Sequence, residues 1–211
     1  MKKSPILWFF VLLVFITLFT AIGPAEATLG KNARVVYLHG AWVWASLAAF
    51  IAAGAAGLVA IIRRVRGKDA LPLHAWSRAL GRTGLCFWIT YLPISLWAMQ
   101  TNWNGLFLAE PRWRVAAIFA IAGFLLQLGL SFLPVSWASF WNLAYVVTLF
   151  VVLQITEKVM HPPSPMLESS AWRIQIFFGG LTVLLILAAW QVARFFYAFE
   201  HSCVQDSILP Q

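Results

Sequence analysis

Two histidines of this 211-residue chain stand where a cofactor-borne metal could be held. His39 follows Tyr37 and Leu38 at the start of a long apolar run, and His161 lies in a proline-rich stretch between two later apolar runs. Neutral imidazoles can supply both axial ligands of a heme iron, and they add no charge to an apolar environment. His39 and His161 are therefore our candidate iron ligands.

The segment 103–114 carries side chains that suit the rest of such a ligand. Arg112 and Arg114 offer guanidinium groups, which bind carboxylates such as heme propionates in bidentate fashion. Trp103 and Trp113 offer flat apolar surfaces, and Gly40, next to His39, would leave room for a macrocycle. These residues complete the candidate binding site.

Each of these residues also has a simpler interpretation. A histidine at a helix end is often a half-solvated cap, and Trp is enriched at both membrane interfaces as an amphipathic anchor. Arg112 and Arg114 can serve only to balance Glu110. Spacing alone leaves both interpretations open.

The composition identifies the environment in which such a site must lie. Hydrophobic residues make up 62% of the chain and charged residues 10%, with a mean hydropathy of +0.81, whereas about a quarter of the residues in soluble domains are charged. Lys, Arg, Asp and Glu are absent from five runs, 4–25, 35–62, 83–109, 115–156 and 174–193. The sequence therefore predicts an integral membrane protein without a soluble catalytic domain, and we expect no enzymatic activity.

The lengths of the charge-free runs predict how many helices cross the membrane. A crossing needs about 20 apolar residues, so four runs hold one helix each, and the run 115–156, divided at Pro134, holds two. We predict a single all-α domain over residues 1–211, a bundle of six transmembrane helices followed by a cytoplasmic tail at 194–211. The predicted helices are 6–22, 35–62, 83–100, 115–133, 136–156 and 172–193.

Basic residues predict the orientation of this bundle. The polar stretch 63–82 contains six of the fifteen Lys and Arg residues, and such loops remain on the cytoplasmic side. Both termini are then inside, while His39, the segment 103–114 and His161 share the outer face. The net charge of +8 reflects this orientation rather than nucleic-acid binding.

Two helices carry further signals. The first begins after Lys2 and Lys3 and precedes an Ala-x-Ala sequence at 25–27, so it is either an uncleaved anchor, which its length favours, or a cleaved signal. The second has small residues at every fourth position, which lets helix backbones approach closely and predicts a central place in the bundle. These residues are Ala41, Ala45, Ala49, Ala53 and Gly57. In the third helix, Pro93 predicts a kink.

The layout over about residues 5–195 resembles the cytochrome c maturation protein C (heme exporter protein C) family of the cytochrome c assembly superfamily. Tyr37-Leu38-His39 resembles the family's first histidine motif, and His161 has the place of its second histidine. Ala109-Glu110-Pro111-Arg112 stands where the family has Trp-Asp-Pro-Arg, so the Trp-rich signature is degenerate and the chain resembles a divergent member.

The resemblance implies a function in heme handling. In that family, six helices surround a heme platform at the outer face of the plasma (inner) membrane, and heme is passed to a partner for cytochrome c assembly. It implies non-covalent heme b, the lipid bilayer, a heme-carrier or cytochrome assembly protein and a larger membrane complex as partners. Two alternatives remain: a structural subunit that has lost the cofactor, and a b-type electron carrier. The sequence has no Cys-x-x-Cys-His motif for covalent heme.

Overall fold

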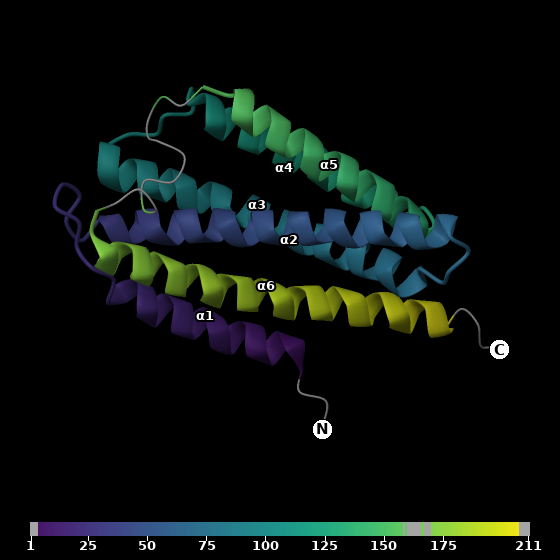
Figure 1. The fold of residues 1–211 in the computed structure, drawn as a ribbon. Helices are drawn as coiled ribbons and strands as arrows, with labels where there is room; N and C mark the ends of the chain where they lie inside the picture. The colour runs from purple at the N-terminus through teal and green to yellow at the C-terminus, as the bar shows by residue number, and fades with distance from the viewer. Residues whose placement is uncertain (1–3, 158, 160–165, 167–169, 207–211) are drawn as a thin grey trace.

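The computed structural model describes residues 4–157, 159, 166 and 170–206, with side chains up to residue 200. This part of the chain forms six helices (Figure 1), so the prediction of an all-helical fold is confirmed. They are α1 (Pro5–Ala21), α2 (Ala33–Val65), α3 (Leu71–Trp103), α4 (Pro111–Ser131), α5 (Val135–Ile155) and α6 (Trp172–Asp206).

Four of the helices, α2, α4, α5 and α6, are long and apolar enough to cross a membrane. The apolar helix α1 is shorter, at 17 residues. Helix α3 has 33 residues but is not among the four. Polar and aromatic residues lower its hydropathy, and Thr90, Tyr91 and Ser95 lie in its middle.

Two predicted boundaries are wrong because charged residues do not end their helices. Helix α3 begins at Leu71 rather than at residue 83, and α6 continues to Asp206 where a tail from residue 194 was expected. Arg78 and Glu200, which belong to these two extensions, form an ion pair with each other inside the bundle. The predicted inner loop therefore shrinks to residues 66–70. Helix α3 also runs on through Pro93.

Helix α2 is central, as its small residues predicted. Within the described chain it contacts every other helix except α4, and all five residues of the small stripe are buried. Helices α4 and α5 lie on one side of the α2–α3 pair, and α6 and then α1 lie on the other (Figure 1).

The bundle has two ends, which we name by their connections. The turn end has the short connections 66–70 and 132–134, and the loop end has 22–32, 104–110 and the residues between α5 and α6. Helices α4 and α5 diverge from α2 toward the loop end (Figure 1). Helices α2 and α5 lie close together nearer the turn end. A Cβ added to Gly57 of α2 would be 2.5 Å from the Ser139 carbonyl oxygen of α5. Glycine there lets the α2 and α5 backbones touch.

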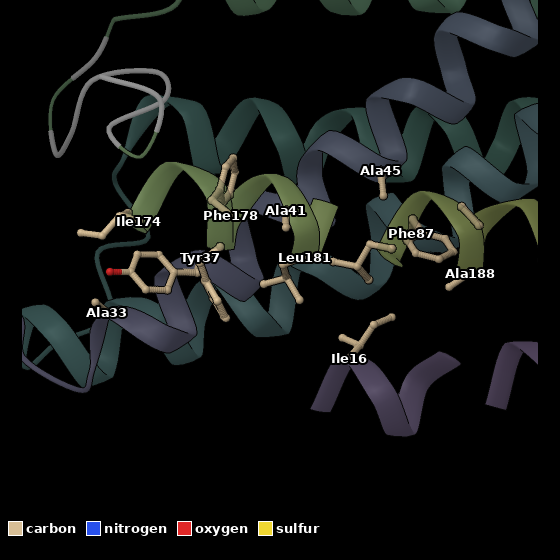
Figure 2. Close-up of a cluster of buried hydrophobic side chains, with 13 residues drawn as sticks. Ile16, Ala33, Tyr37, Ala41, Ala45, Phe87, Ile174, Phe178, Leu181 and Ala188 are labelled. Carbon is tan, nitrogen blue, oxygen red and sulfur yellow. The ribbon is translucent and has the colours of Figure 1, made fainter. Parts of the chain in front are cut away.

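Buried side chains form two apolar clusters on opposite sides of α2. The first joins α1, α2 and α6, with Phe87 of α3, around Tyr37, Phe178 and Leu181 (Figure 2). The second joins α2, α3, α4 and α5 around Trp88 and Tyr91. The second cluster lies on the side where α4 and α5 diverge.

The loop before α2 is organised by an acidic residue. The Glu26 carboxylate accepts backbone N–H bonds from Thr28 and Leu29, both at 2.8 Å. These bonds favour the ionised form and hold the pKa of Glu26 below its usual value. Further along, the Arg34 side chain donates to the Gly23 carbonyl at 2.9 Å, which ties the end of α1 to the start of α2.

Candidate functional site

A cavity of about 340 Å³ lies at the loop end, between α2 and α3 on one side and α5 and the start of α4 on the other. Its volume is within the range of small-molecule sites, roughly 300–1,000 Å³. Most of its wall is apolar or aromatic. The lining residues are Val36, His39, Gly40, Val43, Trp44, Leu47, Trp88, Tyr91, Ser95, Ala98, Met99, Trp103, Glu110, Arg112, Trp113, Phe150, Leu153, Gln154, Met166 and Phe178.

The cavity brings together four of the six predicted site residues. His39 from α2, Trp103 from the end of α3, and Arg112 and Trp113 from the start of α4 all line it. They are separated by as many as 74 positions in the sequence, so the fold alone makes them neighbours.

The other two predicted residues have different outcomes. Arg114 is exposed and is not among the lining residues; its Nε donates to the Leu108 carbonyl at 3.1 Å. His161 lies outside the described residues. Met166, from the same linker as His161, lines the cavity, so this linker contributes to the wall.

The cavity is polar at its rim and apolar at depth. Glu110 and Arg112 lie at the loop end, whereas Leu47 and Trp88 lie deeper along α2 and α3. Trp88 precedes Trp103 by fifteen residues, which is roughly 22 Å along a helix axis. A long amphipathic ligand matches this gradient.

The rim has hydrogen-bonding capacity that the described residues do not use. The Arg112 Nε and the Trp113 Nε1 are buried, and neither has a hydrogen-bond partner in the described part of the chain. Both residues lie in the first turn of α4, where the helix dipole disfavours a cation and attracts an anion. An arginine at position 112 therefore does not stabilise the helix. An anionic group in the cavity would supply the missing hydrogen-bond partner of its Nε.

The surroundings of His39 partly fit the predicted role. Its ring lies beside that of Tyr91, with centroids 5.6 Å apart. The space beside Gly40, which we expected to hold a macrocycle, faces Phe178: a Cβ on Gly40 would be 3.1 Å from the Phe178 Cε2. Gly40 thus admits a phenyl ring of α6, and any flat ligand must lie elsewhere in the cavity.

Most wall residues were not predicted from the sequence, and two of them, Trp88 and Glu110, are the most informative. Trp88 was not among the predicted site residues, but it is 1% exposed, lines the deep end of the cavity and donates from Nε1 to the Ala116 carbonyl at 3.0 Å. Glu110 was interpreted as a counter-charge for arginine and as part of the degenerate signature, but not as a site residue, yet it is buried and lines the rim. The periodicity of α3 offered a signal for Trp88, since residues 88, 91, 95, 99 and 103 recur at helical spacing and all line the cavity.

The turn end contains a second group of buried and partly buried polar side chains, which were predicted to lie in the cytoplasmic loop 63–82 and in the tail from residue 194. The Glu200 carboxylate pairs with both Arg78 and Arg82 of α3. Arg78 also donates to the Leu133 carbonyl at 2.7 Å, and Arg82 to the Ser131 hydroxyl at 3.2 Å. These contacts tie α3 to α6 and to the turn between α4 and α5.

Further polar contacts join the same part of α3 to residues one to two turns into α4 and α5. Gln127 of α4 donates to the Asn142 side-chain oxygen at 2.8 Å, and Asn142 of α5 donates to the Ser77 carbonyl at 2.7 Å. The His74 Nδ1 and the Ser139 Oγ are hydrogen-bonded at 2.6 Å. His74 is therefore a structural histidine, bonded within the bundle.

The potential metal-ligating side chains near the cavity limit which kind of metal centre it could hold. In the described part of the chain, no group of three or more His, Cys, Asp or Glu side chains is close enough to bind a metal ion. A bare ion that depends on several protein ligands does not fit these residues. A metal already held by a macrocycle fits better, because it takes only one or two axial ligands from the protein.

Comparisons with protein-family models, curated proteins and solved structures find no match to this chain.

Proposed function

We propose that this chain is a multi-pass membrane protein that binds and hands on heme at its loop end. The observation that carries the proposal is the single cavity lined by His39, Trp103, Arg112 and Trp113. An imidazole, two indoles and a guanidinium around an otherwise apolar space match the iron, the ring and the carboxylates of heme respectively.

Each residue then has a definite task. His39 and His161 would bind the iron of a non-covalent heme b. Arg112 would pair with a propionate, and Trp103 and Trp113 would contact the macrocycle. Arg114 is left out of this assignment, because its side chain is exposed and does not line the cavity.

The proposed role is binding and relay rather than catalysis. Heme supplies redox-active iron when it is bound, and the protein holds and orients it. The resemblance to the cytochrome c maturation protein C family supports delivery to a heme-carrier or cytochrome assembly protein, as part of a larger membrane complex.

An absorption spectrum with a pyridine hemochrome assay on the purified protein tests heme binding. We expect a stoichiometric heme signal in the wild type and loss of most of it in His39→Ala and in His161→Ala. His201→Ala, near the C-terminal end of α6, is the matched control and should keep the signal. A colourless wild type, or equal heme in all the variants, contradicts the proposal.

The outcomes also separate the alternatives. A colourless but folded protein supports the structural subunit. Heme that is reduced reversibly but never transferred to another protein supports the b-type electron carrier. Transfer to an apoprotein supports the relay.

We further propose that all six helices cross the plasma (inner) membrane, with both termini in the cytoplasm and the cavity at the outer face. Single cysteines at Leu106 and Lys68, in a background with Cys86 and Cys203 replaced by Ser, test this orientation. Leu106 belongs to the loop end and Lys68 to the turn end. A membrane-impermeant thiol reagent added to intact cells should label position 106 and not position 68. Labelling of both, or the reverse pattern, contradicts the orientation.

A further inference from the structure

A second hollow runs along the seam between α2 and α5. It is an open groove of about 410 Å³. Every residue that lines it is apolar or glycine: Ile51, Gly54 and Ala55 from α2, and Leu143, Val146, Val147, Phe150 and Val151 from α5. No polar side chain of this wall could bind a polar solute.

The groove and the cavity share one wall residue. Phe150 lines both of them. Along α2, the cavity wall ends at Leu47 and the groove wall begins at Ile51, one turn further on. The two spaces therefore follow one another along α2 and α5, and Phe150 belongs to the wall of both.

The spacing between α2 and α5 increases from the turn end toward the loop end. At Gly57 the α2 backbone meets Ser139 directly, and at Gly54 it meets the Val146 side chain, which would lie 2.7 Å from an added Cβ. Beyond these contacts α5 diverges from α2 toward the loop end (Figure 1). The groove lies where the two helices begin to separate.

We propose that this groove binds the hydrocarbon chain of a bilayer amphiphile. The proposal rests on the membrane placement proposed above and not on heme binding. Ile51, Val147 and Val151 on the groove walls are about half exposed, at 48%, 54% and 55%, so their outer surfaces face hydrocarbon when α2 and α5 cross a bilayer. A linear chain can fill such a groove and gain dispersion contacts on both walls.

A second protein helix fits the groove less well than a chain does. Close helix packing in membranes needs small residues that expose the backbone. The one glycine of the groove, Gly54, is already covered by Val146. Ala55 is the other small residue of the groove, and the larger side chains of the remaining wall residues would hold a neighbouring helix away. A thin, flexible chain is not excluded by these features.

Photolabelling tests this assignment. The full chain is reconstituted in phosphatidylcholine vesicles that contain a small fraction of phosphatidylcholine with a diazirine in the middle of one acyl chain. After irradiation, the labelled residues are mapped by mass spectrometry. We expect several-fold more label per exposed residue at Ile51–Ala55 and Leu143–Val151 than on the exposed face of α4 at Ile118, Ile121 and Leu125.

Two matched substitutions make the test specific. Ala55→Trp fills the groove and should reduce its label several-fold. Ala122→Trp, at an exposed alanine of α4 that lines neither space, should leave the label unchanged. Phe150→Ala shortens the one side chain that lines both spaces and should extend the label into the cavity, at Leu47 and Leu153.

Several results would overturn the proposal: equal label on the groove and on α4, no effect of Ala55→Trp, or label still confined to the groove in Phe150→Ala. Disulfide crosslinking of Val147→Cys to a second copy would show that protein covers the groove. If the chain did not enter the bilayer, label would be lost from α4 as well as from the groove. Groove labelling in a colourless protein would contradict heme binding alone.

Discussion

The two ends of the bundle both bury polar side chains, but they satisfy them differently. At the turn end, Glu200 is shared by Arg78 and Arg82, and Asn142 joins α3, α4 and α5. At the loop end, the Arg112 Nε and the Trp113 Nε1 are buried next to a cavity without a hydrogen-bond partner among the described residues.

This difference distinguishes polar groups that stabilise the fold from polar groups that are available to a ligand. A buried polar group that is paired within the protein holds helices together, whereas one that is left without a partner costs free energy until something else satisfies it. The turn end therefore has the features of a fixed anchor, and the loop end those of a site prepared for a ligand.

The largest expected effect is at the anchor. Glu200→Gln removes the carboxylate shared by two arginines and leaves their charges uncompensated, so we expect the free energy of unfolding to fall by about 3 kcal/mol. Denaturant unfolding in mild detergent measures it. Arg194→Gln is the control, because Arg194 has an exposed contact with Gln191. If Glu200→Gln is as stable as the control, the turn end is not an anchor.

A smaller effect is expected deeper in the same network. Asn142→Leu leaves Gln127 and the Ser77 carbonyl without their bonds and should cost about 2 kcal/mol. Gln127→Leu combined with Asn142→Leu should cost less than the sum of the two single changes, because each removes a partner of the other. A double-mutant cycle of unfolding free energies measures the coupling, and strict additivity would argue against a shared network.

The smallest change in stability is expected at the cavity. Arg112→Met removes a buried guanidinium nitrogen that lacks a partner, so the heme-free protein should differ from wild type by only about 0.5 kcal/mol. The same variant should lose heme affinity. A loss of stability as large as that of Glu200→Gln would remove the distinction between the two ends.

Much of the fold could be predicted from where charges are absent. Six helices follow from the apolar runs, and the small stripe from Ala41 to Gly57 correctly placed α2 at the centre. The ends of α3 and α6 could not be predicted, because the pairing of Arg78 with Glu200 joins residues 122 positions apart. A charge that finds a partner inside the bundle no longer marks the end of a helix.

The candidate site could be predicted only in part. Residue type and position relative to the apolar runs selected His39, Trp103, Arg112 and Trp113, and these line one cavity. The helical spacing of Trp88 with Trp103 places both on one face of α3, but the depth of the cavity along that face depends on how α4 and α5 pack, which the sequence does not reveal. The exclusion of Arg114 depends on the turn at Leu108, which its sequence context does not reveal.

The connection between α4 and α5 has a mechanical consequence. These helices join through residues 132–134 and are bonded to α3 near that turn, while their other ends border the cavity. Helix α5 has 21 residues, which makes it a lever about 30 Å long. With its pivot at the turn end, a tilt of about 5° would displace the far tip by roughly 3 Å. A tilt too small to disturb the pivot would thus alter the width of the cavity mouth by about the diameter of one atom.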